Sequence, residues 1–400
     1  IFHCDLNCFY ASVELLSHPE LREVPVAVAG DPASRHGIIL AKNEPAKQCG
    51  VKTAETIWQA KKKCPNLVLL PAHHKLYREY SKKVNAIYDE YTDLAESFGI
   101  DESWLDVTNT LHLFGGDAKA LANAIRQRVK RELGLTLSVG VSFNKVFAKL
   151  GSDYKKPDAT TVISRENWRS IVWPLPVGDL LYVGGAAQKL LGQYGVKTIG
   201  QLAACKKETL ETLMGKMGTQ LYEYANGLDS APVRARLDAE PVKSVGNGTT
   251  FPQNLTTRIQ VRSGIAVLAD SVATRLRREA LSAGGPQATV GDQTFHGRSR
   301  PKQLPPPTHP IRDLTRAAMA LTEELWTPPA PIRALTVTAI HLSPDREAYE
   351  QADLFDPTAG QRNARQEKLE SAMDAIRKKY GGDAIVYGAA RPEKEEDPLP

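Results

Sequence analysis

Long hydrophobic runs are missing from this sequence of 400 residues, because no apolar segment approaches the eighteen residues typical of a membrane span. Cysteine is also scarce. The five cysteines are odd in number, scattered and without a C-x-x-C spacing, which gives no basis for paired zinc ligands and predicts free thiols. With no secretory signal at the start, we expect a reducing, cytoplasmic location. Since the chain begins at Ile1, we expect a few native residues to be missing.

A large excess of one charge is absent too, because the formal net charge is only +5. The charge is unevenly spread, however. Residues 241–344 carry 12 basic and 6 acidic side chains, whereas residues 345–400 carry 9 and 13. A basic segment before an acidic one favours a polyanionic partner for the former, although a solvated surface explains so small an excess equally well.

Apolar spacing along the first 165 residues predicts an α+β domain. The expected order is strand, helix, strand, strand, helix, strand, which is typical of a split βαβ sheet of ferredoxin-like type with residues 11–72 inserted. One helix should cover 74–94, with Leu76, Tyr80, Val84 and Ile87 on its apolar face. Another should begin after Asp117 as N-cap and stop at Gly134.

The rest of the chain predicts two further modules and a tail. Residues 166–235 read as all-helical, and "VGGAAQ" within them fits either a helix-hairpin-helix turn or a plain connector. Residues 241–344 alternate strands with two helices and include a possible hairpin that carries Arg298, Arg300 and Lys302 on one side. Beyond 345 we expect an acidic, largely mobile tail with one helix near 362–380.

The stretch "SFGIDESWLDVT" places two adjacent acids, Asp101 and Glu102, in an apolar frame. Such pairs arise by chance in a chain of this composition, but an unpaired buried carboxylate costs several kcal/mol. These acids therefore need water, a cation or a metal. Because neighbouring residues of a strand point to opposite faces, both can serve one site only if the chain bends there, as at a hairpin tip.

Asp5 offers a third carboxylate at the end of the apolar run "IFHC". In a split βαβ sheet the first strand can lie beside the strand at 100–107, so the three acids could meet. Carboxylates without histidine suit Mg²⁺, and two such ions support phosphoryl transfer. From the spacing alone, N-caps and surface acids remain the commoner explanation.

Four motifs, in this order and spacing, strengthen the metal hypothesis: "DLNCFYASVE" (5–14), "GIDESWLDVT" (99–108), "SVGVSFNKVFAKLGSDYKKP" (138–157) and "KSVGNGTTF" (243–251). Together they resemble the bacterial Y-family translesion DNA polymerases of the DinB or DNA polymerase IV type, over about residues 1–345. The resemblance implies a palm (1–10 and 73–165), fingers (11–72), a helix-hairpin-helix thumb (166–235) and an α/β little finger (241–344).

The resemblance also implies roles for individual residues. Asp5, Asp101, Glu102 and the backbone carbonyl of Leu6 would hold two Mg²⁺ ions, with Glu102 nearest the primer 3′-hydroxyl. Tyr10 would be the steric gate under the nucleotide sugar, where the simple alternative is core packing. The remaining implied nucleotide contacts are Phe9 beside the same pocket, and Lys47 and Lys156 at the triphosphate.

The motif "LAKNEPAKQCGV" departs from the family, which commonly has tyrosine in place of Glu44 and arginine in place of Lys47. Lysine keeps the charge but loses the two-pronged guanidinium geometry, so Lys47 stays a candidate and Glu44 does not. For DNA, the implied contacts are Gly184 in the thumb and Ser244, Gly246, Arg298 and Arg300 in the little finger.

The tail contains "QADLF", which resembles the peptide that binds the bacterial β sliding clamp through Gln351, Leu354 and Phe355. The whole sequence thus predicts a monomeric, template-directed, low-fidelity DNA polymerase that takes primer-template DNA and a dNTP and has no membrane partner. Two alternatives use the same residues. A two-metal nuclease needs the acids but not Tyr10, and a DNA-binding or clamp-docking scaffold would keep the acids for structure alone.

Overall fold

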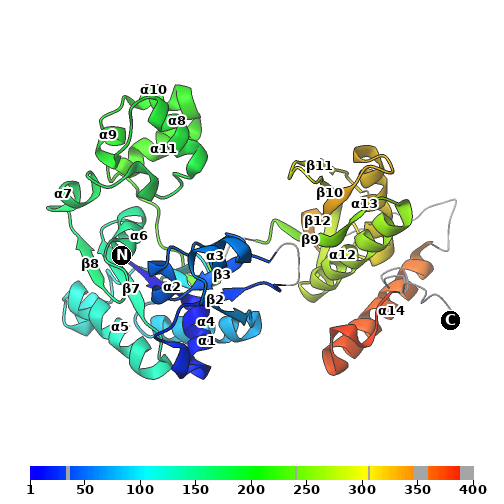
Figure 1. Ribbon diagram of the computed structural model, residues 1–400, viewed down its shortest axis with the longest axis horizontal. Coiled ribbons are helices and arrows are strands. Elements are labelled where there is room, and N and C mark those ends of the chain that lie inside the picture. Colours follow the sequence, from blue (N-terminus) through cyan, green and yellow to red (C-terminus); the bar gives the residue numbers. More distant parts are fainter. Residues whose placement is uncertain (33–36, 239–240, 305–306, 346–358, 388–400) are drawn as a thin grey trace. The chain divides into compact units, whose positions relative to one another are not determined.

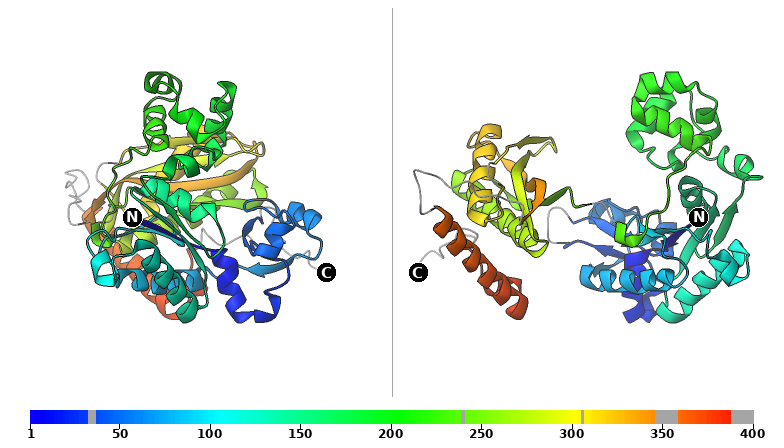
Figure 2. Two further views of the ribbon diagram at one scale, coloured as in Figure 1. Left: turned by 90° about the vertical axis from the view of Figure 1, so that its left-hand side faces the viewer. Right: turned by 180° about the vertical axis from the view of Figure 1, so that it is seen from behind.

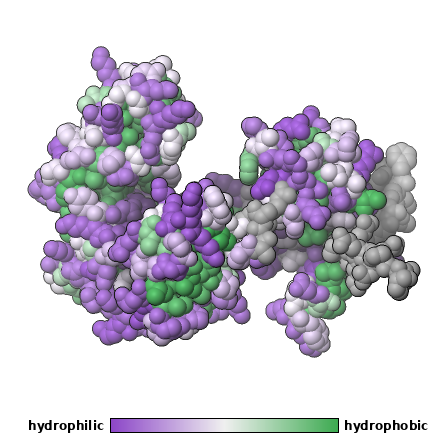
Figure 3. Space-filling model, in the orientation of Figure 1, coloured by the Kyte–Doolittle hydropathy of each residue, from purple (hydrophilic) through white to green (hydrophobic). Residues whose placement is uncertain are grey.

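The computed structural model describes residues 1–32, 37–238, 241–304, 307–345 and 359–387. The chain divides into two units, Ile1–Ala239 and Glu240–Pro400. Within the described ranges, no helix is both long and apolar enough to cross a membrane. Figure 3 shows mostly hydrophilic side chains on the visible face of each unit, with one larger hydrophobic area on the first.

A five-stranded sheet lies at the centre of the first unit (Figure 1). Its strands, from edge to edge, are β5 (Ala95–Ser97), β6 (Glu102–Leu105), β1 (Phe2–Leu6), β7 (Leu137–Ser142) and β8 (Thr160–Ile163). The central strand β1 pairs antiparallel with β6 and β7, and β7 runs parallel to β8. All five residues of β1 are buried, so both faces of this strand are covered. The predicted α+β class is confirmed.

Helices cover both faces of this sheet. On one face lie α1 (Phe9–Ser17), α4 (His74–Asp89) and α5 (Ala118–Leu133), and on the other lies α6 (Lys145–Tyr154). The α5 helix begins and ends as predicted. The Asp117 carboxylate accepts hydrogen bonds from the amides of Lys119 and Ala120, and Gly134 ends the helix with φ of 68°.

A second, smaller core lies in the inserted segment. It contains β2 (Val26–Ala29), β3 (Ile39–Lys42), β4 (Val68–Pro71), α2 (Glu44–Gln48) and α3 (Ile57–Lys63). The sequence predicts that this insertion starts at residue 11. In the structure α1 packs into the core of the large sheet through Phe9 and Val13, so the separate core begins only at β2.

The segment predicted as all-helical consists of short helices that stand as a separate lobe of the first unit (Figure 2). They are α7 (Trp168–Val172), α8 (Gly185–Gln193), α9 (Ile199–Ala203), α10 (Lys207–Met214) and α11 (Lys216–Ala225). Their core includes Phe147 of α6, which connects the lobe to the sheet.

The second unit contains a four-stranded sheet in the order β11, β10, β12, β9. The strands are β9 (Ser244–Leu255), β10 (Leu281–Gly291), β11 (Gly297–Pro301) and β12 (Ile332–Pro344), and the helices α12 (Arg258–Arg278) and α13 (Ile311–Leu325) cover one face. The stretch that the sequence left irregular contains the β10–β11 hairpin, which confirms a hairpin carrying Arg298 and Arg300.

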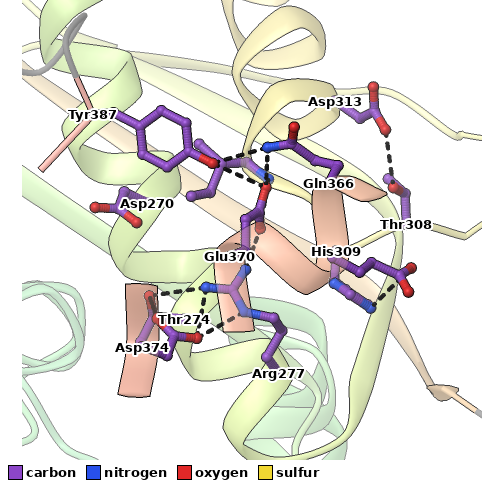
Figure 4. Close-up of polar contacts among 12 residues, drawn as sticks. Asp270, Thr274, Arg277, Thr308, His309, Asp313, Gln366, Glu370, Asp374 and Tyr387 are labelled. Carbon is purple, nitrogen blue, oxygen red and sulfur yellow. Dashed lines mark hydrogen bonds and ion pairs between the residues drawn. The ribbon is translucent and has the colours of Figure 1, made fainter. Parts of the chain in front are cut away.

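A last helix, α14 (Ala359–Tyr380), lies against α12 and α13 of the same unit (Figure 4). The paired side chains are Asp270 with Arg377, Thr274 with Asp374, and Arg277 with both Glu370 and Asp374. Residue numbers increase along α12 as those of the paired residues on α14 decrease, so the two helices are antiparallel. Glu370 is fully buried and also accepts a hydrogen bond of 3.0 Å from the Ile311 amide at the start of α13. The helix expected near residues 362–380 is therefore present, and it packs against the second unit.

Candidate active site

Two of the three predicted acids are cross-strand neighbours. Asp5 of β1 stands directly opposite Glu102 of β6 in the antiparallel register. Because side chains alternate along a strand, Asp5 and His3 face α6, whereas Phe2, Cys4 and Leu6 enter the core on the other face. The two carboxylates therefore lie together at the end of the central strand pair.

Asp101 lies in the turn that joins β5 to β6. The amides of Phe98 and Gly99 both donate to the Glu102 carbonyl, and the Leu6 amide donates to the Asp101 carbonyl at 3.0 Å. The chain thus bends directly before β6, as the adjacent acids require. Leu6 is tied to the same turn, which keeps the end of β1 beside both acids.

Two lysines of α6 and the loop after it face these carboxylates. The Lys149 ammonium lies 2.9 Å from Glu102 Oε2 and 3.4 Å from Asp5 Oδ2, and the Lys156 ammonium lies 2.6 Å from Asp5 Oδ2. Both lysines also pair with Asp153, at 3.4 and 2.7 Å. Lys156 was predicted from the sequence, whereas Lys149 was missed although it lies one helical turn after Lys145.

The acids differ in their proton affinity. Burial raises the pKa of Asp101 to about 6, and repulsion by Asp5 and Glu102 adds to this. Burial also raises the pKa of Asp5, although Lys156 opposes it. Glu102 behaves in the opposite way: burial alone would raise its pKa, but the adjacent His3 ring and the charge of Lys149 lower it to about 2.

His3 is a buried partner that sequence reasoning missed. Its Nε2 lies 3.3 Å from Glu102 Oε2, and its Nδ1 lies 2.8 Å from the Ser152 hydroxyl on α6. Burial lowers the pKa of His3, which favours the neutral ring. The available signal was its position two residues before Asp5, which puts both on one face of the strand.

The residues present fit a hard divalent cation. The carboxylates of Asp5 and Glu102 lie together with His3, with one ligand atom of each within 4.8 Å of the others, and Asp101 is near enough for both acids to raise its pKa. The raised pKa of Asp101 follows from burial and from negative charge that lysines alone do not balance. Oxygen donors of this kind are the ligands that Mg²⁺ prefers.

Phe9 and Tyr10 open α1, which begins three residues after Leu6. Tyr10 is half-buried, and its ring stacks on Tyr77 of α4 at 4.1 Å between centroids and 14° between planes. Phe9 is buried in the core of the sheet and touches both tyrosine rings. A direct nucleotide contact of Phe9 stays a prediction, because its ring packs behind Tyr10.

Glu44 and Lys47, the two residues that differ from the family, lie on α2 and form a small cluster. Lys47 donates to Glu44 at 2.6 Å, and the Cys8 thiol donates to Glu44 at 3.2 Å. The cation next to Glu44 lowers the pKa of this half-exposed carboxyl although burial opposes that shift, so Glu44 and Lys47 form an ion pair. The acid therefore balances the charge that Lys47 would offer to a phosphate.

The predicted DNA contacts do not lie together. Val245 opposes Ala339 in the helix-covered core, so Ser244 and Gly246 face the open side of the sheet. On the opposite edge, Arg298 and Arg300 pair with Val290 and Ala288, which point to the helices. Arg300 accordingly forms an ion pair of 3.0 Å with Glu324 of α13.

The other two predictions concern the thumb and the tail. Gly184 is the N-cap of α8, exposed to solvent, and among the described residues no side chain caps this helix start. Its amides are therefore open to an anion. Gln351, Leu354 and Phe355 lie outside the described residues.

Comparisons with known proteins show which family the chain resembles. The family model described as "impB/mucB/samB family" matches residues 4–153, and the model of its C-terminal domain matches residues 242–354. A DNA polymerase IV of Acetivibrio thermocellus is 47% identical over 97% of this chain and 96% of its own length. DNA polymerase IV 1 of Bacillus subtilis is 36% identical over 99% and 94%. In fold, a solved Y-family DNA polymerase chimera matches 86% of this chain and 99% of its own, with a TM-score of 0.75 at 22% identity.

Proposed function

This chain belongs to the impB/mucB/samB family of Y-family DNA polymerases and is a DNA-directed polymerase of the translesion type, and we propose that Asp5, Asp101 and Glu102 carry its nucleotidyl transfer. The reaction joins the primer 3′-oxygen to the α-phosphorus of a dNTP and releases pyrophosphate. The observation that supports the proposal is the cross-strand pair of Asp5 and Glu102 with Asp101 in the adjoining turn.

We propose that these three carboxylates, with the Leu6 carbonyl, hold two Mg²⁺ ions. When bound, such ions activate an attacking oxygen and stabilise a leaving one. The residues of this chain then have separate tasks. Glu102, whose pKa is lowered to about 2, stays ionised and would lie beside the primer terminus, with the His3 ring 3.3 Å from one of its oxygens. Lys156 lies at Asp5 and can neutralise a triphosphate.

Tyr10 is proposed as the steric gate that excludes the 2′-hydroxyl of a ribonucleotide. Tyr10 lies in the first turn of α1, and its ring is half-buried. Burial, and to a smaller extent repulsion from Asp101, raises the pKa of its hydroxyl, which therefore stays neutral. Lys47 is proposed to reach the triphosphate only when it leaves its pairing with Glu44.

The DNA contacts proposed are the α8 amides at Gly184 and the open sheet face at Ser244 and Gly246. Arg298 and Arg300 remain candidates on the other face. We also propose that Gln351, Leu354 and Phe355 bind a β sliding clamp, and that the protein acts as a monomer in the cytoplasm.

Its five cysteines, all within the described residues, are free thiols, which is consistent with a reducing compartment.

Primer extension with Mg²⁺ tests the function and its alternatives. The wild-type protein should lengthen a labelled primer, whereas a nuclease would shorten it and a scaffold would do neither. Asp101→Ala with Glu102→Ala should abolish extension and leave DNA binding intact. Asp89→Ala with Glu90→Ala is the matched control, because it removes an exposed pair of adjacent acids from the same unit at residues with no proposed role in the reaction. Undiminished synthesis by the first variant would overturn the assignment of the acids.

A further inference from the structure

We propose that Glu14, acting through Tyr77, is a positioning residue that holds the steric gate in place and thereby sets how strongly the enzyme discriminates against ribonucleotides. The inference rests on the proposed role of Tyr10. It adds residues that neither touch the acids nor belong to the metal site.

The arrangement starts from helical spacing. Tyr10 and Glu14 are four residues apart on α1, so they lie on one face of this helix. Tyr77 comes from the facing helix α4 and lies between them. Its ring stacks on Tyr10, and its hydroxyl donates a short hydrogen bond to Glu14 Oε1. The gate and the carboxylate are therefore joined through a single side chain.

Tyr77 is fixed from several sides. The side chain is fully buried, and its hydroxyl also accepts a hydrogen bond of 3.0 Å from the His73 amide. The His73 ring in turn lies 2.9 and 3.1 Å from the two oxygens of Glu14. His74 meets the edges of both tyrosine rings, with 5.7 Å between centroids in each case. These contacts leave Tyr77 little room to move away from Tyr10.

A steric gate discriminates only if it does not yield. A sugar with a 2′-hydroxyl pushes against the ring of Tyr10, and the ring can retreat only if Tyr77 retreats too. That movement would break the Tyr77 hydrogen bonds, which would leave its buried hydroxyl without a partner and the Glu14 carboxylate with the His73 ring alone, so it is unfavourable. The deoxyribose does not push against the ring, so the network should affect ribonucleotides selectively.

Core packing alone does not explain Glu14. Its side chain is only 6% exposed, and an apolar residue would fill the same space without the desolvation of a carboxylate. The oxygen atoms of Glu14 are used to fix the direction of the Tyr77 ring. A buried polar group holds its neighbour in one orientation through directional hydrogen bonds, whereas an apolar group only fills the space beside it.

The test compares single-nucleotide incorporation of a dNTP and the matching rNTP by the full chain. The variants are Glu14→Gln, Glu14→Leu, Tyr77→Phe and Tyr77→Leu, with Tyr10→Ala as the reference for the gate and Glu20→Leu as the control. Glu20 lies just beyond α1, with its side chain 65% exposed. We expect Glu14→Leu and Tyr77→Leu to reduce the preference for dNTP roughly tenfold, mainly by faster rNTP incorporation. A tenfold change in preference corresponds to about 1.4 kcal/mol. Glu14→Gln keeps an acceptor and should resemble the wild type.

Each outcome has one meaning. If Tyr10→Ala lowers the preference but the leucine variants do not, the gate stands and the inference about Glu14 and Tyr77 is wrong. If Tyr10→Ala changes nothing, the proposed gate itself fails. Should a leucine variant not fold, Tyr77→Phe carries the test, because it keeps the ring and removes the hydrogen bonds. It should then lower the preference by a smaller factor with dNTP incorporation unchanged, and an unaltered preference would contradict the proposal.

Discussion

This protein has two clusters in which acidic and basic side chains pair, and the two clusters differ in the kind of cation they use. At the proposed active site, Asp5 and Glu102 meet Lys149 and Lys156. In the second unit, Asp270, Glu370 and Asp374 meet Arg277 and Arg377. The former cluster uses lysine as its cation, and the latter uses arginine.

The choice of cation matches the task. Arg377 engages both oxygens of Asp270, at 2.9 and 2.6 Å, in the two-pronged geometry that only a guanidinium provides. Such a contact fixes one helix on another. A lysine ammonium is a single point charge, so Lys149 can leave its acids when another cation arrives without losing a defined geometry. The arginine cluster is therefore suited to permanent docking, and the lysine cluster to exchange.

The largest effect should come from Asp5→Asn. This change removes one of three acids but keeps the side-chain size, so we expect primer extension to fall at least about a thousandfold, or about 4 kcal/mol. The free energy of unfolding of the first unit should not fall with it. Asp153→Asn is the control, because Asp153 pairs with the same two lysines but is not a proposed ligand. Equal losses of extension in both variants would remove the distinction between ligand and neighbour.

Arg277→Met should instead cost stability and not chemistry. It leaves the fully buried Glu370 without its cation, and breaking a buried ion pair in this way costs about 3 kcal/mol. Chemical denaturation of the second unit and hydrogen exchange of the α14 amides measure the effect. The neighbouring Arg278→Met is the control, since that side chain is 70% exposed. Unchanged protection of α14 would mean that the arginine cluster does not hold the helix.

Asp101→Asn should stabilise the metal-free protein. A pKa raised to about 6 means that the native state binds the proton more tightly than the unfolded state, so stability falls as the pH rises from about 4 to about 6. At pH 7 the variant should be more stable by about 2 kcal/mol in chelator, and this advantage should shrink towards pH 4. Urea titrations with chelator and with Mg²⁺ measure it. A wild type that is equally stable at pH 7 in chelator would contradict the raised pKa.

The smallest expected effect sharpens the contrast between the cations. Arg277→Lys keeps the charge at the docking cluster but contacts fewer oxygens, so we expect a loss of about 1 kcal/mol, well below that of Arg277→Met. Denaturation of the two variants side by side gives the comparison. If lysine served as well as arginine, geometry would not be the reason for the arginines.

Sequence reasoning singled out the proposed catalytic acids because their signal is local. Asp101 and Glu102 conflict with an apolar frame, and such a conflict can be seen in twelve residues. The α4 helix shows where this approach fails. Periodicity correctly placed Val84 and Ile87 on its buried face, but Leu76 and Tyr80 are only partly buried, and the fully buried Tyr77 was not predicted. A tyrosine with a buried hydroxyl needs a distant acceptor, and no spacing along one helix reveals Glu14.

The docking of α14 was hidden for a related reason. Its residues are polar, and polarity in a single segment predicts a solvated or mobile chain. The information lies in the match between two helices, because Asp270, Thr274 and Arg277 repeat at the same spacing as their partners on α14. Complementarity of this kind is visible only when both segments are known to be neighbours.

The central strand β1 contributes to both the core and the proposed site, which limits the insertions that it can tolerate. Its five residues serve the core on one face and the acids on the other, and both edges are already paired. A shift by a single residue would carry Leu6 to the proposed metal site and Asp5 into the apolar core. Insertions can accumulate in loops of this protein, but a one-residue insertion within β1 would remove stability and catalysis at once. This strand should therefore be the part of the chain least open to redesign.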